Sequence, residues 1–549
     1  MNNSKQSQTN ALSDTPLNMV VSVFLLLMFA VFPLFVGIYA DGQFPFIHFD
    51  DGFFNIRHDK YYFFVTMALI AVVAEIMVIV TKGSPELKGR KLSTVFKPLS
   101  FTDWSALALV VSCSLSTLFS PYPELAFWGE INKNGVSAGR NNGLFLILVY
   151  VLIYFVITRF FRYKETVFTA LAISCSLVYL LTVLNGYYLD PLNMLTQFKV
   201  SQPNVYMEFF STIGNKNMLA SFICVTLPVS IVMSVLTEKL WRRIVYLIAS
   251  GLGMMAMIIG DSDSAMLGTA VFIAVFLVVF ARNAARLKRF FLALCVMLAS
   301  IGLLRLFSAA MHDNYKELGS IPKALLFSSS VYVLLAVCAA ITALLYIIEK
   351  QQPDIRFPKA VSIALGALFG LAALTGFTVF LYFSVIDKET PLGDMEKLLR
   401  MNDAWGTHRG IMWLRSFDVF AAANPWQKLF GTGPDTFYYA FEPYFKQLQE
   451  YGNSSTDAAH NEYINYLITI GAAGLASYLT FTGGALVRGF KSAKSNPAVL
   501  CCAAAVIAYL AQATVNIALP ISTPLFIVFV SLCEAFARHD KACQLLPTK

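Results

Sequence analysis

Residues 217–236 read NMLASFICVTLPVSIVMSVL, a run of consecutive positions without a single charged side chain. A helix of about 20 apolar residues spans about 30 Å, which is the thickness of the hydrocarbon core of a bilayer. Similar stretches recur along the 549-residue chain, in which 57% of residues are hydrophobic and only 13% are charged. A soluble protein has about twice that charged fraction. The sequence therefore predicts an all-α, polytopic transmembrane helical bundle.

The hydrophobic pattern predicts about fourteen membrane spans, and about twelve to fourteen are compatible with it. The spans are expected near residues 19–40, 61–81, 103–120, 143–158, 166–184, 217–236, 244–260, 264–281, 290–309, 324–348, 360–386, 461–484, 497–517 and 522–537. They divide the chain into residues 1–386 with the first eleven spans, residues 387–460 as one large loop, and residues 461–549 with the last three spans and a tail.

The loop 387–460 contains aromatic and aliphatic residues throughout, which is typical of a folded and functional loop rather than a disordered one. Two of its segments, 392–402 and 409–422, have helical periodicity. We therefore expect a large, partly helical loop that either forms a site or serves as a structural cap.

Basic side chains alternate between the connections of the predicted spans. Clusters of lysine and arginine, such as those at residues 82–97, 239–243 and 282–289, fall on every second connection. The positive-inside rule makes these connections and both termini cytoplasmic and the loop 387–460 extracytoplasmic. The net charge of +8 then faces anionic membrane lipid and requires no nucleic-acid partner. The nine cysteines fall outside the predicted outer loops, and their spacing indicates neither a disulfide framework nor a metal site.

Polar residues gather where predicted spans begin on the outer side, and His460 is the first of them. Thr456 and Asp457 are capping candidates just before a strongly apolar helix. His460 is therefore expected in the first turn of that helix, followed by Asn461. A helix dipole there lowers the pKa of the imidazole and keeps a neutral base available at physiological pH. The alternative interpretation is a hydrogen-bonded residue at the membrane boundary.

Arginine and lysine residues near other outer helix ends are candidates for binding anions. Arg409 opens a helical segment with Trp413 on the same face, and a guanidinium suits diphosphate oxygens because it binds them bidentately. Arg140 precedes the fourth span, and Lys216 and Asn217 precede the sixth, so each places a cation at a helix N-terminus. A structural ion pair for Arg409, and membrane-interface anchoring for the others, explain the same residues.

Three more charged residues lie within or between the predicted spans. Arg305 falls within the ninth span, where an arginine is costly and is either functional or extends to the interface. Asp261 and Asp263 suggest a divalent metal site, but a short polar turn explains them and no metal is predicted. The chain also lacks the Walker and Rossmann glycine patterns. Chemistry at the outer face then needs an already activated substrate or an ion gradient, which leaves a transferase or a transporter.

Several segments resemble, in the same order, the O-antigen ligases and O-antigen polymerases. His460 and Asn461 are followed after nine residues by Gly-Ala-Ala-Gly, ending at Gly474, and this spacing is similar to the signature of the family. The other similar segments are SPYPELAFWG at 120–129, GRNNG at 139–143, IGNKNMLASFICVTLP at 213–228, RGIMW at 409–413 and NPWQKLFGTGPDTF at 424–437. The resemblance covers roughly residues 100–490.

The resemblance implies a metal-independent, inverting glycosyltransferase that uses no cofactor. Such proteins move a glycan from an undecaprenyl-diphosphate carrier to a lipid, glycan or protein acceptor, at the outer face of the bacterial cytoplasmic membrane. It implies that His460 deprotonates the acceptor hydroxyl and that Arg409 holds the diphosphate. Residues expected to bind substrate are Arg140, Lys216, Asn217, Arg305, Trp413 and Asn461.

The sequence departs from the family pattern at one position of consequence. The family often has Ser-Arg-Gly or Ser-Arg-Ser at the outer start of a middle span, where residues 261–268 read DSDSAMLG. The second diphosphate cation is therefore missing, and we expect Arg305 or Arg140 to replace it. The family also usually has about twelve spans, so two of the predicted spans are additions or the count is high.

The sequence does not separate a ligase from a polymerase of the same superfamily. A polysaccharide flippase or another transporter is the alternative of a different class, since about fourteen spans are common there. Transporters typically have internal repeats and helices broken at mid-membrane, whereas this chain has no convincing repeat and clusters its polar residues at the outer ends of spans. This difference favours a transferase. A non-catalytic membrane scaffold is a third possibility.

Overall fold

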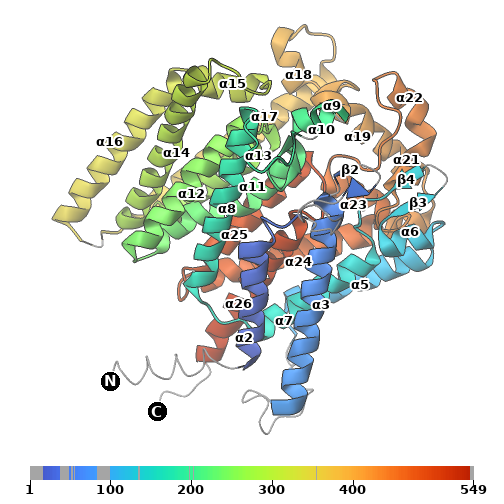
Figure 1. Ribbon diagram of the computed structural model, residues 1–549, viewed down its shortest axis with the longest axis horizontal. Helices are drawn as coiled ribbons and strands as arrows, with labels where there is room; N and C mark the ends of the chain where they lie inside the picture. Colours follow the sequence, from blue (N-terminus) through green and yellow to red (C-terminus); the bar gives the residue numbers. More distant parts are fainter. Residues whose placement is uncertain are drawn as a thin grey trace.

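A computed structural model describes residues 16–36, 49–50, 53–54, 56–82, 99–133, 136–196, 198–201, 203–353 and 355–544. It is a bundle of long helices with a group of short helices packed beside it (Figure 1). The protein is 77% helical, which confirms the predicted all-α polytopic membrane fold. Strand in the described ranges is confined to three antiparallel pairs. The pairs are β1 (Phe49–Asp50) with β2 (Phe53–Phe54), β3 (Ile131–Lys133) with β4 (Val136–Ala138), and β5 (Phe209–Phe210) with β6 (Gly214–Asn215).

The helices follow the order of the predicted spans, with short helices between them. Up to residue 386 they are α2 (Pro16–Leu26), η1 (Leu27–Val31), α3 (Ile56–Lys82), α5 (Phe101–Leu118), α6 (Pro123–Trp128), α7 (Leu144–Phe160), α8 (Glu165–Gly186), α9 (Phe198–Ser201), α10 (Pro203–Glu208), α11 (Lys216–Leu236), α12 (Leu240–Ile259), α13 (Asp263–Phe280), α14 (Ala284–Ala310), α15 (Ser320–Phe327), α16 (Ser330–Gln351), α17 (Lys359–Leu381) and η2 (Tyr382–Ile386). After it they are η3 (Gly393–Met395), α18 (Glu396–Leu399), α19 (Trp405–Ala422), α20 (Pro425–Phe430), α21 (Phe437–Phe441), η4 (Glu442–Tyr444), α22 (Phe445–Gln449), α23 (Glu462–Thr469), α24 (Gly471–Ser492), α25 (Val499–Gln512), η5 (Ala513–Val515) and α26 (Thr523–Gln544).

Nine helices within the described ranges are long and apolar enough to cross a membrane. They are α3, α5, α8, α11, α12, α13, α14, α16 and α17 with η2. Three further predicted spans fall on shorter apolar helices, at Pro16–Val31, Leu144–Phe160 and Val499–Val515. Residues 37–40 of the first predicted span lie outside the described residues. Each predicted span thus coincides with helix, while the number that cross the membrane remains a prediction.

Three predicted spans are wrong in their boundaries. In the first, expected at 19–40, the helix ends at Val31, and residues 32–36 are not helical. The span expected from residue 324 begins only at Ser330, because Phe327 ends the separate helix α15. The span expected at 461–484 is two helices, α23 and α24, interrupted at Ile470. Gly471 follows this interruption with a φ of 69°, a left-handed conformation that favours glycine. The chain therefore bends where the sequence pattern predicts one continuous helix.

The helix α11 forms the centre of the bundle, and 94% of the residues in its most apolar 18-residue stretch are buried. It packs against α12, α13, α14 and α25. At the opposite extreme, α17 has no buried residue in the described fold, which is typical of a helix surrounded by lipid. The first residue of α11 is Lys216, so the most buried helix of the bundle begins with one of the cations singled out from the sequence.

The predicted loop 387–460 folds into the 18-residue helix α19 and several short helices, and Figure 1 shows α19, α21 and α22 on the same side of the molecule as α23. Within it, the segment 392–402 forms only a turn and the four-residue α18, whereas the segment 409–422 lies inside α19. The loop has its own hydrophobic core, shared with α23. The buried residues of this core are Ile411, Met412, Phe437, Phe441, Leu448, Ala459, Ile464 and Ile468. The loop is therefore a packed unit that fixes the side chains on its inner surface.

Candidate active site

A cavity of about 620 Å³ lies between this packed loop and the beginnings of α7 and α11, and we call it the site cavity. Five residues singled out from the sequence line it, and they come from four separate segments of the chain. These residues are Arg140, Lys216, Asn217, Arg409 and His460. The other polar side chains around it include the carboxylates of Glu208 and Asp457, the imidazole of His408, and the hydroxyl and amide groups of Tyr451, Asn453, Ser455 and Thr456.

The helix α23 begins later than predicted, and this changes the place of His460. Asn461 is the N-cap, because its side-chain oxygen accepts hydrogen bonds from the amide nitrogens of Tyr463 at 3.0 Å and Ile464 at 3.1 Å. His460 therefore precedes the helix instead of lying in its first turn, and its φ of 50° is left-handed. The predicted role of Asn461 in substrate binding finds no support here, since its side chain caps the helix and does not line the site cavity.

The backbone beside His460 is held from two sides. The indole nitrogen of Trp413 donates a hydrogen bond of 3.0 Å to the carbonyl oxygen of Ala459. The amide of Ala459 in turn donates to the side-chain oxygen of Asn465 at 3.2 Å. Trp413 was expected to contact substrate, but it does not line the site cavity and instead positions the residue before His460.

The imidazole of His460 is neutral over the physiological range. Burial is the largest cause, and the guanidinium groups of Arg140 and Arg409 add to it, so that the pKa of His460 falls to about 3 while Asp457 opposes the change. The sequence predicted that a helix dipole lowers the pKa of His460. In the structure, burial and the two guanidinium groups lower it instead. No hydrogen-bond partner for the ring is found in the described part of the chain. The ring nitrogens are therefore available to a ligand in the cavity.

Arg409 is a partly buried cation that forms no ion pair within 4.0 Å with any described residue. Burial lowers the pKa of its guanidinium, and Asp263 offsets this only in part. Among the residues that the structure describes, none forms an ion pair within 4.0 Å or a hydrogen bond with the Arg409 side chain. Arg415, on the same helix, pairs with Asp418 at 2.5 Å. Because buried charges are normally paired, the unpaired guanidinium of Arg409 indicates a position for an anionic ligand.

The backbone that presents Arg409 is irregular. Gly406 has a φ of 59° and His408 a φ of 68°, so the first turns of α19 depart from regular helix. Gly410 lies so close to the carbonyl of Asn402 that a Cβ there would overlap it. Left-handed non-glycine residues are strained and cluster at functional sites. His408 lines the site cavity and was missed from the sequence, although it directly precedes Arg409.

Arg140 reaches the site cavity from the loop before α7, and two carboxylates hold it there. Its side chain forms an ion pair with Asp457. Its amide and that of Asn142 donate to Asp435 at 2.6 Å and 2.8 Å. Asp435 is buried, and burial raises the pKa of its carboxyl to about 6 in spite of these two hydrogen bonds. Asp435 thus links the loop of Arg140 to the glycine-containing segment that follows α20.

Lys216 is the first residue of α11, and its ammonium lies 3.4 Å from the carboxylate of Asp261. The amide of Asn217 is already capped by the side chain of Asn215 at 3.1 Å. An anion at the N-terminus of α11 would therefore bind the flexible ammonium of Lys216 and not the amide of Asn217. Asp261 also accepts a hydrogen bond of 2.7 Å from the amide of Gly319, so it joins two connections of the bundle.

Arg305 does not line the site cavity. Its guanidinium donates to the carbonyl oxygen of Phe327 at 3.2 Å, at the C-terminal end of α15, and lies 5.9 Å from the centre of the Phe327 ring. A cation at that end of a helix is stabilised by the helix dipole. Of the two residues expected to replace the missing arginine, only Arg140 therefore lies at the cavity among the described residues.

Glycines from two segments meet directly behind the site. Gly431 has a φ of 79°, and a Cβ on it would overlap the carbonyl of Thr469; a Cβ on Gly471 would overlap Leu429. The amide of Gly433 also donates to the carbonyl of Thr469 at 2.8 Å. The break between α23 and α24 therefore lies at the point where the loop after α20 contacts these two helices. This contact explains why both segments need glycine.

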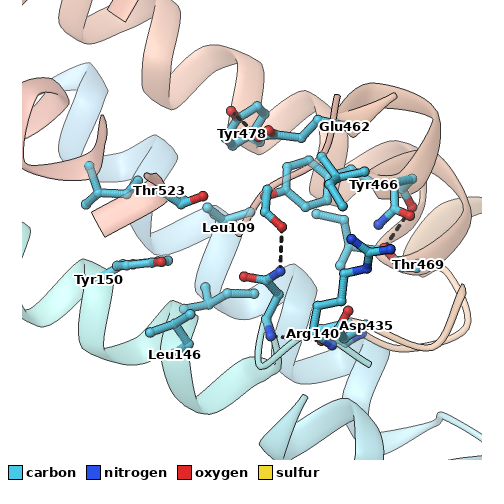
Figure 2. A pocket seen from close by; sticks show the side chains of 18 of the residues that line it. Leu109, Arg140, Leu146, Tyr150, Asp435, Glu462, Tyr466, Thr469, Tyr478 and Thr523 are labelled. Atoms are coloured by element: carbon cyan, nitrogen blue, oxygen red, sulfur yellow. Dashed lines mark hydrogen bonds between the residues drawn. The ribbon is translucent and has the colours of Figure 1, made fainter. Parts of the chain in front are cut away.

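A second, enclosed pocket of about 60 Å³ adjoins the site cavity, with Arg140 lining both. Figure 2 shows Arg140 and Asp435 at one end of it, and Glu462 beside Tyr478 at the other. The carboxylate of Glu462 accepts hydrogen bonds from the hydroxyls of Tyr478 at 2.6 Å and Tyr509 at 2.9 Å. This network ties α23 to α24 and α25 and keeps the helix after His460 in place.

The fold and the site define a helical, polytopic membrane protein with a polar cavity at the ends of its helices. Residues 318–479 match the family model described as O-antigen ligase, so this stretch of the chain is similar to that family. The matched stretch includes both Arg409 and His460. The segments 120–143 and 213–228 lie before it, so their resemblance to the family stays a prediction. No curated protein matches the chain.

Proposed function

We propose that this protein transfers a glycan from a lipid-diphosphate donor to an acceptor hydroxyl inside the site cavity. The similarity to the O-antigen ligase family supports a glycan-transferring enzyme of the ligase and polymerase superfamily. The observation that carries the proposal is the chemistry of one cavity. It is lined by the guanidinium of Arg409, which has no ion-pair partner in the described chain, and by the neutral imidazole of His460.

In this proposal Arg409 binds the diphosphate of the donor. A guanidinium stays charged and forms paired hydrogen bonds with phosphate oxygens, so it neutralises the charge that develops as the diphosphate leaves. Arg140 and Lys216 contribute less, because each is already paired with a carboxylate, Asp457 or Asp261. The dianionic character of the donor thus supplies the counterion that Arg409 lacks.

His460 is the proposed general base. Its neutral ring takes the proton of the acceptor hydroxyl while that oxygen bonds to the anomeric carbon of the donor sugar. The bond from that carbon to the diphosphate oxygen breaks, and its electron pair leaves with the diphosphate. A single displacement of this kind inverts the configuration at the anomeric carbon. The bound diphosphate also neutralises Arg140 and Arg409, which lower the pKa of His460, so binding makes the imidazole a stronger base.

We place the cavity at the extracytoplasmic face of a bacterial cytoplasmic membrane, with an undecaprenyl-diphosphate-linked glycan as donor. This orientation rests on the basic clusters at the opposite ends of the helices, for example after α11 and before α14. The cavity then opens where a flipped lipid-linked glycan is exposed. The acceptor hydroxyl belongs to a lipid, a glycan or a protein.

The full-length protein in detergent provides the test. It is incubated with an undecaprenyl-diphosphate-linked oligosaccharide and separate lipid, peptide and glycan acceptors, without ATP and without an ion gradient. We expect glycan to appear on one acceptor with release of undecaprenyl diphosphate. A transporter gives no covalent product under these conditions and moves the donor across the membrane of proteoliposomes, which would contradict the proposal. A polymerase is recognised by extension of the donor glycan itself.

A further inference from the structure

A second large cavity, of about 740 Å³, lies between α12, α14 and α16. It belongs to the opposite end of the bundle from the site cavity, because α11 begins at Lys216 in the site cavity and its far end leads into α12. A helix of this length spans about 30 Å. In Figure 1, α14 and α16 stand together at one side of the bundle. We call this space the side cavity.

Three cations form one end of the side cavity, and they outnumber their carboxylate partners. Arg243 forms no ion pair with any described residue and donates to the carbonyl of Thr237 at 2.6 Å. Lys288 pairs with Glu349. Arg289 lies 3.4 Å from Glu238, whose side chain is 83% exposed and therefore well solvated. The cavity thus carries positive charge that the described residues do not fully neutralise.

Apart from the thiol of Cys295 and the hydroxyls of Thr342 and Tyr346, the rest of the side cavity is lined by apolar side chains. Small side chains on α16, Ala339 and Ala343, leave a space against Leu292 of α14. Thr342 lies between them, but its hydroxyl donates to the carbonyl of Cys338 in its own helix, so it offers no donor to the cavity. The cations and the apolar wall are continuous within one space. Such a space suits a molecule with a phosphate at one end and a hydrocarbon chain at the other.

We propose that the side cavity binds an anionic glycerophospholipid, with its phosphate at Arg243 and Arg289 and one acyl chain along Ala339 and Ala343. Clusters of lysine and arginine at the membrane surface attract anionic lipids, and basic pockets between transmembrane helices bind their headgroups. A free phosphate makes no use of the apolar wall. A zwitterionic lipid brings its own ammonium group into a cluster that already holds three cations. Charge complementarity therefore selects a lipid with a net negative headgroup.

Native mass spectrometry of the full-length protein in detergent tests this proposal. The probes are phosphatidylglycerol, phosphatidylcholine with the same acyl chains, and glycerol phosphate. We expect the wild type to bind phosphatidylglycerol more tightly than phosphatidylcholine. Replacing Arg243→Gln together with Arg289→Gln keeps amide donors for the neighbouring carbonyls but removes two charges. Each charge near a membrane surface contributes about fivefold, so the double variant should lose about 25-fold in phosphatidylglycerol affinity.

A second double variant, Ala339→Leu with Ala343→Leu, fills the apolar part of the side cavity and leaves its three cations unchanged. It should lose phosphatidylglycerol while binding of glycerol phosphate stays at the wild-type level. The control is Lys491→Gln with Lys494→Gln, two exposed cations at the end of α24 remote from Gly471, outside the side cavity. It removes the same charge and should bind phosphatidylglycerol like the wild type.

Three results would overturn the proposal. If the wild type binds phosphatidylglycerol and phosphatidylcholine with equal affinity, the side cavity does not select its lipid by charge. If the Lys491 and Lys494 control loses as much phosphatidylglycerol affinity as the Arg243 and Arg289 variant, the effect comes from the general positive charge of this face of the membrane protein and not from the side cavity. If the variant Ala339→Leu with Ala343→Leu binds phosphatidylglycerol like the wild type, no acyl chain occupies the side cavity, and the cations bind only a phosphate group. Melting temperatures of all variants identify any that fail to fold, and the alanine-to-leucine variant and the arginine-to-glutamine variant test the same site independently. None of these readouts uses glycan transfer, so this inference and the proposed function stand or fall separately.

Discussion

Partly buried arginines occur in two regions of this protein, and their surroundings differ. In one region, between α5, α7, α24 and α26, every arginine faces a carboxylate, and we call it the ion-pair cluster. Arg488 binds Glu534 with two hydrogen bonds, of 2.6 Å and 2.9 Å. Arg159 binds Asp103 with hydrogen bonds of 3.1 Å and 3.2 Å, and Arg538 contacts both carboxylates. Both carboxylates are fully buried.

In the site cavity, by contrast, Arg409 has no carboxylate within 4.0 Å among the described residues. The ion-pair cluster satisfies its charges internally and therefore holds four helices together. In the site cavity one charge has no ion-pair partner among the described residues, and the proposed function assigns it an anionic ligand. Under the proposed function, the presence or absence of a carboxylate partner separates the structural arginines from Arg409 better than burial does, because both kinds are partly buried. The following predictions test the comparison.

The largest effect is expected for His460→Ala. Removing a general base costs on the order of 10²–10⁴ in rate. We expect turnover to fall in that range while donor binding and melting temperature stay near the wild-type values, since the ring has no hydrogen-bond partner in the described chain. His312→Ala is the matched control, because His312 is also left-handed, with a φ of 55°, but is exposed and outside the site cavity. Normal turnover of the folded His460 variant contradicts the proposed base.

The ion-pair cluster should respond in stability instead of rate. Glu534→Ala leaves Arg488 without its partner and Arg538 with only Asp103. Breaking a buried ion pair from one side costs about 3–5 kcal/mol. We therefore expect a strong fall in yield and melting temperature, with unchanged transfer rate per folded molecule. If the variant is stable but inactive, the two regions are coupled and the comparison fails.

Arg409 should respond in rate, in a graded order. Loss of one preorganised donor to developing negative charge costs about 10²–10³ in rate. Arg409→Ala should lose that much at saturating donor, and Arg409→Lys should retain part of the activity because an ammonium does not bind bidentately. Arg415→Ala on the same helix removes an exposed pair with Asp418 and should leave the rate unchanged. Equal rates for wild type, Lys and Ala would give Arg409 a structural role.

A smaller effect is expected for Trp413→Phe, which keeps the ring in the loop core but removes the hydrogen bond to the carbonyl of Ala459. A hydrogen bond of this kind contributes about 1 kcal/mol, or about fivefold. Turnover should fall by about that factor with unchanged donor affinity. A fall in donor affinity with normal turnover would instead assign Trp413 to substrate binding.

The smallest effect is a difference between two pH profiles. The pKa of His460 is about 3 in the ligand-free protein because of burial, Arg140 and Arg409. Protonation inactivates the base, so the acid limb of kcat/KM should lie near pH 3, far below the usual range of histidine. Bound diphosphate neutralises the arginines and raises the pKa, so the acid limb of kcat should lie at higher pH. Coincident limbs near pH 6.5 contradict this account of the site.

The sequence predicted the helical membrane fold and five of the residues that line the site cavity, because both depend on local patterns. Apolar runs specify helices, and polar residues at helix ends specify where Arg140, Lys216, Arg409 and His460 emerge. It failed where distant segments decide the local geometry. The cap at Asn461 is one such case, because the sequence pattern offered Thr456 and Asp457 as caps and placed Asn461 within the helix.

The break at Gly471 and the place of Arg305 are further cases of this kind. The break depends on the approach of Gly431, which lies 40 positions earlier in the sequence. The role of Arg305 depends on α15, whose C-terminal carbonyl it binds. His408 was missed because a lone histidine beside Arg409 has no periodic or spacing signal. Only the folded loop shows that it faces the same cavity.

The contact between Gly431 and Gly471 also determines how the loop can be exchanged between related proteins. A chimaera that replaces residues 387–460 would join a foreign Gly431 segment to the native break between α23 and α24. Neither side has room for a Cβ, so a mismatch of even one methyl group cannot be absorbed there. The transplantable unit therefore extends from residue 387 through Gly474, so that the loop moves together with the first turn of α24.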